Sequence, residues 1–185
     1  MLGIDVSEIA AIDFLIVPTI TFRTLYIFVV LSLDRRQVIH FNVTSHPTAE
    51  WTARQLVQAF PFESAPKYLI RDRDGIYGGR VLETIKFLNM HDKVISARSP
   101  WQNGYCERVV GTIKREFLNH MIIFNESHAR RLLKKYFEYY HEDRTHLGLD
   151  KETPSCRKIE PHHLGLVKRK PMAGGLHSRY FREAA

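Results

Sequence analysis

The order of the apolar segments along this 185-residue chain is the feature that most restricts its fold. Three apolar runs come first, over residues 10–17, 25–33 and 37–43, and short turn-like segments join them. Runs rich in β-branched and aromatic residues with turns between them predict an antiparallel meander of three strands. The longest run, LYIFVVLSL, has about half the length that a bilayer requires, so we expect a buried strand and no membrane association.

Helices and strands alternate after this meander. Apolar residues at three- and four-residue spacing predict a helix that ends before Pro61, and a short strand follows over 67–72. Further along the chain we expect a helix, a fifth strand and two longer helices, over residues 80–88, 93–96, 105–121 and 127–141. The order β-β-β-α-β-α-β-α-α favours an α/β fold in which helices pack on a mixed five-stranded sheet.

The length of the chain suits one domain with a sizeable core. After Leu149 the pattern fades into a segment with proline, glycine and clustered basic residues. We therefore expect a core over residues 1–155 and a basic C-terminal tail over 156–185. The N-terminus lacks the basic and apolar regions of a secretion signal, and Cys106 and Cys156 lack zinc-ligand spacing, so we expect a reducing cytoplasm.

The chain is basic, with 27 Lys and Arg residues against 20 Asp and Glu residues and a net charge of +7. The surplus is concentrated in two segments. Residues 108–135 hold seven basic and two acidic side chains, and residues 150–185 hold eight and four. Basic patches of this kind favour a polyanionic partner such as nucleic acid. A merely soluble basic surface fits the charge equally well, so charge alone does not decide the function.

Three carboxylates lie at positions that suggest chemistry. Asp13 interrupts an apolar strand, where an unpaired charge is costly to bury, although a hydrogen-bonded structural role would also explain it. Asp72 closes a strand, and Glu107 lies near the start of a helix, where an acid is favourable by itself. If the three converge, cations must offset their repulsion. Mg²⁺ prefers such hard oxygen ligands, and two ions about 3.5–4 Å apart can support an in-line phosphoryl displacement.

Four stretches resemble the catalytic core of the DDE recombinases, which comprise the retroviral integrases and the related insertion-sequence transposases. They are AIDFL, IRDRDGIY, SPWQNGYCERVVGTIKREFL and YFEYYHEDRTHLGLDKETP. They follow the family's order and together cover roughly residues 10–155. His141 and Thr145 depart from the Asn and Pro that are usual in the last motif. The resemblance implies a ribonuclease H-like fold and a DDE-type polynucleotidyl transferase that cleaves and transfers DNA strands in integration or transposition, using Mg²⁺ (or Mn²⁺), with two ions expected.

The resemblance also assigns Asp13, Asp72 and Glu107 as the catalytic residues and metal ligands. The family's second aspartate comes five residues before an aromatic residue, and counting back from Tyr77 selects Asp72 rather than Asp74. The interval to Glu107 is 35 positions from Asp72 (107 − 72), which is about the family's usual spacing. Because Asp74 is followed by glycine, we expect it to be a turn residue, with a supporting acid as the alternative.

Four residues are candidates for DNA binding. Lys114 follows Glu107 by seven positions, almost two helical turns, and so shares its face of the helix. Arg108 and Arg115 border the same groove. The family contacts DNA through the loop before this helix, and this implies a DNA contact for Asn103. A solvated basic helix face is the alternative for the three cations.

The resemblance implies DNA partners, namely element ends and target DNA, and a homo-oligomer. The chain starts about ten residues before the first catalytic strand, so we expect a separate end-recognition domain or protein, and a bacterial, nucleoid-associated location in the cytoplasm. Two other functions were weighed. A non-catalytic DNA-binding or multimerisation remnant is disfavoured by the intact triad. A ribonuclease H-like nuclease acting on RNA–DNA hybrids would not need the YYHEDRTHLGL segment.

Overall fold

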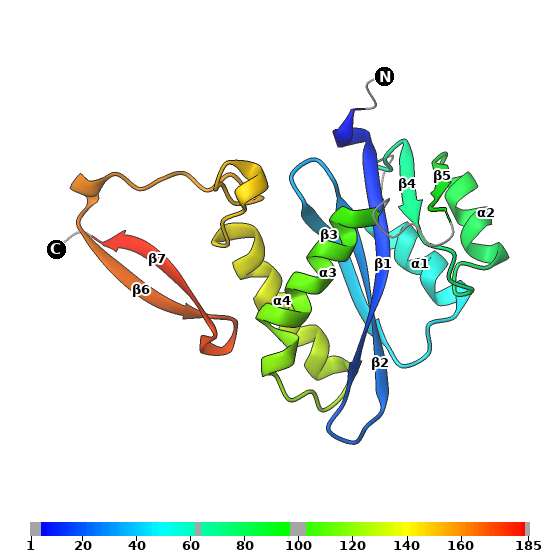
Figure 1. Ribbon diagram of the computed structural model, residues 1–185, viewed down its shortest axis with the longest axis horizontal. Coiled ribbons are helices and arrows are strands. Elements are labelled where there is room, and N and C mark those ends of the chain that lie inside the picture. Colours follow the sequence, from blue (N-terminus) through cyan, green and yellow to red (C-terminus); the bar gives the residue numbers. More distant parts are fainter. Residues whose placement is uncertain (1–4, 62–63, 97–102, 184–185) are drawn as a thin grey trace. The chain divides into compact units, whose positions relative to one another are not determined.

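The computed structural model describes residues 5–61, 64–96 and 103–183, and the chain forms two compact units, residues 1–126 and 127–185 (Figure 1). The boundary between these units falls before the last long helix. The division into a catalytic core over 1–155 and a basic tail over 156–185 is a division by function and remains a proposal. Within the described residues, no helix is long and apolar enough to cross a bilayer.

The first unit is built on a mixed five-stranded sheet with the strand order β3-β2-β1-β4-β5. Its strands are β1 (Ile9–Pro18), β2 (Thr24–Ser32), β3 (Gln37–Thr44), β4 (Tyr68–Arg71) and β5 (His91–Val94). The first three strands pair antiparallel, as the meander predicts, whereas β4 pairs parallel to β1 and β5 parallel to β4. This topology confirms the predicted mixed sheet and the order of its strands.

Three helices of the first unit follow the predicted apolar stripes. They are α1 (Ala49–Ala59), α2 (Gly79–Phe87) and α3 (Gly104–Glu116), with short 3₁₀ turns over Val6–Glu8 and Leu118–His120. The side chain of Thr48 caps α1 by accepting a hydrogen bond from the N–H of Trp51 at 3.1 Å. Leu56 of α1 and Val81 of α2 are buried in one cluster with Phe28 and Leu69 of the sheet. The helices α1 and α2 therefore cover the same face of the sheet.

The second unit consists of α4 (Glu126–Glu142), an irregular segment and a two-stranded antiparallel sheet. The irregular segment contains 3₁₀ turns over Leu147–Leu149 and His162–Leu164, and the sheet consists of β6 (Leu166–Met172) and β7 (His177–Glu183) around a third such turn, Ala173–Gly175. The imidazole of His177 stacks on the ring of Tyr139, with ring centroids 4.3 Å apart. The fading apolar pattern predicted a basic tail here and did not reveal this hairpin. The glycines that suggested a tail form the hairpin turn, where Gly174 and Gly175 adopt positive φ.

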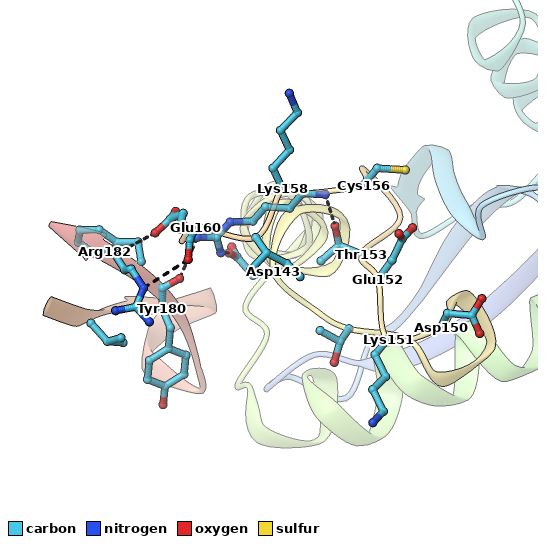
Figure 2. Close-up of a pocket in the computed structure, with 15 residues that line it drawn as sticks. Asp143, Asp150, Lys151, Glu152, Thr153, Cys156, Lys158, Glu160, Tyr180 and Arg182 are labelled. Atoms are coloured by element: carbon cyan, nitrogen blue, oxygen red, sulfur yellow. Dashed lines mark hydrogen bonds and ion pairs between the residues drawn. The ribbon is translucent and has the colours of Figure 1, made fainter. Parts of the chain in front are cut away.

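A groove of about 880 Å³ lies within the second unit, lined by residues of the irregular segment and of β7 (Figure 2). Three of its charged side chains, Asp143, Arg157 and Glu160, form ion pairs. The carboxylate of Asp143 contacts Arg157 at 2.7 Å and Arg179 at 2.9 Å, and Glu160 contacts Arg157 at 2.8 Å. These ion pairs connect the end of α4, the irregular segment and the hairpin, and so hold the parts of the second unit together.

Candidate active site

The register of β1 and β4 explains how two of the candidate carboxylates come together. The strands pair in parallel from Ile9 opposite Tyr68 to Ala11 opposite Ile70. Asp13 and Asp72 each lie two residues beyond this last pair. Parallel strands run in the same direction, and their side chains alternate between the two faces of the sheet. Both carboxylates therefore belong to the same face, at the same level along the two strands.

That face is the one that α3 covers. Ala10 and Ile12 of β1 lie in the core cluster with α1 and α2, so the intervening and following odd-numbered positions, including Asp13, belong to the opposite face. Helix α3 packs on β1. Glu107 lies in the first turn of this helix and Lys114 in its last turn. The fold therefore brings these side chains to the same side of the sheet as Asp13.

The electrostatics of Asp13 show that the candidate residues interact. The pKa of the Asp13 carboxyl is raised to about 7, mainly by burial and to a smaller extent by the negative charges of Asp72 and Glu107. The N–H of Phe14, which donates to Oδ1 of Asp13 at 2.7 Å, opposes this rise in pKa, as does the ammonium group of Lys114. The charges of Asp72, Glu107 and Lys114 are thus close enough to Asp13 to affect its pKa.

The three carboxylates fit a divalent cation by their chemistry but are not assembled as its ligands. Asp13 and Asp72 are half-buried and Glu107 is exposed. In the part of the chain that the structure describes, no three Asp, Glu, His or Cys side chains are grouped closely enough to hold a metal ion. Their oxygen atoms are the hard donors that Mg²⁺ prefers, and a cation between them would offset the repulsion that raises the pKa of Asp13.

The segment after β4 distinguishes Asp72 from Asp74. Oδ1 of Asp74 accepts a hydrogen bond from the N–H of Ile76 at 3.0 Å, and its carbonyl oxygen accepts one from the N–H of Tyr77 at 3.1 Å. Asp74 is exposed and forms the turn that the sequence predicted for it. Oδ1 of Asp72 also accepts a local bond, from the N–H of Asp74 at 3.1 Å, so the turn fixes the side chain of Asp72 as well.

Arg71 supports this segment and was not identified from the sequence. Its guanidinium group is buried and makes a two-pronged ion pair with Asp92 of β5, with N–O distances of 2.9 and 2.7 Å. It also donates to the carbonyl oxygen of Asp72 at 3.0 Å and lies over the ring of Tyr77, 5.6 Å from its centroid. Arg71 therefore holds the backbone of Asp72. The sequence did contain a signal for this role, because Arg71 lies in a short apolar strand directly before the candidate carboxylate Asp72.

Asn103 lies in a different environment from the one expected of a DNA contact. Its side chain is only 4% exposed, and Nδ2 donates to the carbonyl oxygen of Ile12 in β1 at 3.3 Å. It occupies the position before the first residue of α3 but makes no capping hydrogen bond with its side chain. The side chain that the resemblance assigned to DNA is thus enclosed by protein in this structure.

The basic residues of α3 differ in their orientation. Arg108 and Arg115 are exposed, whereas Lys114 is half-buried and acts on Asp13. The guanidinium group of Arg115 lies against Gly111, where a Cβ atom would come within 2.9 Å of Nη1. Arg108 and Arg115 therefore reach solvent, whereas Lys114 lies close enough to Asp13 to lower its pKa.

Comparison with known sequences finds two similarities. The integrase core domain family matches residues 88–154. An uncharacterized 31.7 kDa protein of insertion element IS407 from Burkholderia multivorans is 27% identical over 150 residues, which are 80% of this chain and 54% of that protein. The chain thus spans about half the length of this relative.

Solved structures show the same fold. The catalytic core of BIV integrase superimposes with a TM-score of 0.59 and 17% identity, covering 80% of this chain and 91% of that core. The catalytic core of HTLV-2 integrase, in a dimeric form in complex with magnesium, gives a TM-score of 0.61 and 12% identity, covering 81% of this chain and 94% of that core. The sheet topology and these superpositions show that the chain has the ribonuclease H-like fold of the integrase catalytic cores, a mixed five-stranded sheet flanked by helices.

Proposed function

We propose that this chain carries out metal-dependent cleavage and strand transfer of DNA, with Asp13, Asp72 and Glu107 as the catalytic carboxylates. The family to which the core is matched acts in DNA integration and transposition. The observation that carries the proposal is the position of Asp13 and Asp72, two residues beyond the last pair of β1 and β4, on the face that α3 covers. A purely structural role would not explain why three carboxylates, which repel one another, lie on the same face of the sheet.

The carboxylate oxygens of Asp13, Asp72 and Glu107 would hold Mg²⁺ or Mn²⁺, and two ions are expected. When bound, such ions activate the attacking oxygen and stabilise the leaving oxygen of an in-line phosphoryl displacement. The chain itself contributes orientation. The N–H of Phe14 fixes Oδ1 of Asp13, and the turn at Asp74 fixes Oδ1 of Asp72, so each aspartate keeps its second oxygen for a ligand. The similar HTLV-2 core was solved in complex with magnesium, which agrees with this choice of metal.

The basic residues of α3 would bind the DNA backbone. Lys114, whose charge lowers the pKa of Asp13, would contact a phosphate next to the carboxylates. Arg108 and Arg115 are exposed on the same helix and extend this contact along the strand. Because the three cations meet phosphates and not base edges, they would position DNA without reading its sequence.

The remaining expectations concern the assembly in which the core acts. We propose that the partners are the ends of a mobile element and a target DNA, and that the chain works as a homo-oligomer, since the similar HTLV-2 core occurs in a dimeric form. A separate domain or protein would recognise the element ends. The homology to a protein of a bacterial insertion element favours action at the nucleoid of a bacterium.

A DNA nicking and strand-transfer assay tests this function. The substrate is a branched duplex with a free 3′-hydroxyl, which needs no recognition of element ends. We expect products with Mg²⁺ or Mn²⁺, none after treatment with EDTA, and recovery when excess Mg²⁺ is added back. Equal product formation with and without EDTA would contradict metal-dependent catalysis, and DNA binding without any product under all conditions would favour the non-catalytic remnant.

A further inference from the structure

We propose that Asn103 is a positioning residue, which joins the end of β1 to the start of α3 and thereby sets the separation between Asp13 and Glu107. The inference rests on the proposed function, because it concerns the same carboxylates. It assigns to Asn103 a role inside the protein in place of the DNA contact that the family resemblance implies.

The first step is the way in which β1 and β4 part. Their pairing ends at Ala11 and Ile70. Beyond this point β4 stays with β5: Arg71 is paired with Val94, and the carbonyl oxygen of Arg71 accepts a hydrogen bond from the N–H of Ile95 at 3.0 Å. Among the described residues, no strand pairs with this side of β1 from Ile12 onward.

Asn103 supplies a partner at this point. Its Nδ2 donates to the carbonyl oxygen of Ile12, the residue directly before Asp13. The bond joins positions 91 residues apart in the sequence and is buried. A buried carbonyl group needs a donor, and here a side chain provides the bond that a neighbouring strand would otherwise give. The bond therefore holds β1 at the residue where the first candidate carboxylate begins.

The same side chain also lies at the start of α3. Asn103 immediately precedes Gly104, and Glu107 follows in the first turn of the helix. An asparagine at this position usually caps its own helix through its side-chain oxygen. This one does not, and its Oδ1 is buried without a partner in the described part of the chain. The amide thus does not cap α3 but bonds to β1. The side chain of Asn103 therefore connects the strand that carries Asp13 to the helix that carries Glu107.

The test compares Asn103→Leu with Gln55→Leu. Gln55 is the matched control because its amide is equally buried, at 4% exposed, and its Oε1 lies 3.0 Å from Nε2 of His40 and 2.8 Å from Nδ2 of Asn42, on another part of the sheet. Both changes remove a buried amide. We expect Mn²⁺ to bind Asn103→Leu about 10- to 100-fold more weakly than wild type, the usual effect of losing a residue that orients metal ligands, and to bind Gln55→Leu with unchanged affinity.

A second measurement does not depend on metal. The N–H of Phe14 donates to Asp13, so its hydrogen exchange reports the order of this part of β1. We expect faster exchange at Phe14 in Asn103→Leu and wild-type exchange there in Gln55→Leu. If Asn103→Leu does not fold, Asn103→Ser replaces it in both measurements.

The two measurements separate the possible failures. Asn103→Leu with wild-type Mn²⁺ affinity, or with wild-type exchange at Phe14, would overturn the positioning role. If the wild-type protein binds no Mn²⁺, the proposed function fails, and the exchange at Phe14 then decides the role of Asn103 by itself: faster exchange supports it and unchanged exchange overturns it.

Discussion

Asp13 of β1 and Asp72, the residue directly after β4, each lie two residues beyond the last register pair of these parallel strands, Ala11 and Ile70. The sheet topology itself, and not a flexible loop, brings the two carboxylates together. Helix α3 adds Glu107 and Lys114 to the same face. The geometry makes the roles of individual residues testable, because near neighbours such as Asp74 share the chemistry of Asp72 without sharing its position.

Asp72→Asn and Asp74→Asn are expected to differ strongly. Asp72→Asn should abolish metal-dependent nicking because an amide replaces a carboxylate ligand. Asp74→Asn should reduce it only modestly, because asparagine can still accept the hydrogen bond from the N–H of Ile76 that forms the turn. The initial rate of nicking at saturating Mg²⁺ measures both. A greater loss in Asp74→Asn than in Asp72→Asn would show that the aspartate was chosen wrongly.

Loss of the Arg71 side chain should destabilise the protein. Arg71→Met leaves the carboxylate of Asp92 without its two-pronged partner and the carbonyl group of Asp72 without a donor. Breaking a buried ion pair costs about 3–5 kcal/mol, and we expect the lower end of that range because Asp92 is partly exposed. Urea unfolding measures this loss. Asp92→Asn, which keeps an acceptor for Arg71, should cost clearly less, and a wild-type free energy of unfolding in Arg71→Met would show that the pair contributes no stability.

The basic face of α3 should contribute to DNA affinity without sequence selectivity. The double change Lys114→Ala and Arg115→Ala should weaken binding about equally for unrelated duplexes and make it less dependent on salt, because fewer counterions are released. Lys86→Ala on α2, which removes an exposed cation from another helix, is the control. A salt dependence like that of wild type in the double variant would place these side chains away from DNA.

Sequence alone predicted the parts of this structure that depend on local pattern. Apolar runs between turns marked all five strands of the first unit, although β5 lies two residues earlier than predicted. The Asp74-Gly75 dipeptide marked the turn that Asp74 forms. The burial of Asn103 could not be predicted in this way, since it depends on where β1 and β4 part. The ion pair between Arg71 and Asp92 likewise joins neighbouring strands whose register no local pattern reveals.

The hairpin β6–β7 shows a different limit of sequence reasoning. Its first strand contains three adjacent cations, Lys168, Arg169 and Lys170, and then Pro171, so the apolar alternation that marks a half-buried strand is missing. The strand is formed nevertheless, because its partner β7 is anchored by the stack of His177 on Tyr139 and by the ion pair of Arg179 with Asp143. Contacts made far along the chain thus decided the structure of this segment.

The chain by itself should bind duplex DNA with little sequence preference. The cations of α3 would meet phosphates, which carry no sequence information. A competition assay between a labelled duplex with the terminal repeat of the element and excess random-sequence DNA measures the preference. Strong selective retention would contradict this expectation and would direct attention to the hairpin β6–β7, since a two-stranded ribbon can enter the major groove.

The central claim is that Asp13, Asp72 and Glu107 together form a metal-dependent catalytic site. The most direct measurement is the rate of Mg²⁺-dependent nicking by Asp13→Asn and Glu107→Gln, with thermal unfolding in EDTA as the control for folding. Asparagine at position 13 keeps the acceptor for the N–H of Phe14 and relieves the repulsion from its neighbours, so this variant should unfold at no lower temperature than wild type. We predict that both folded variants lose nicking activity. Nicking at the wild-type rate by either variant would remove that residue from the site and contradict the account.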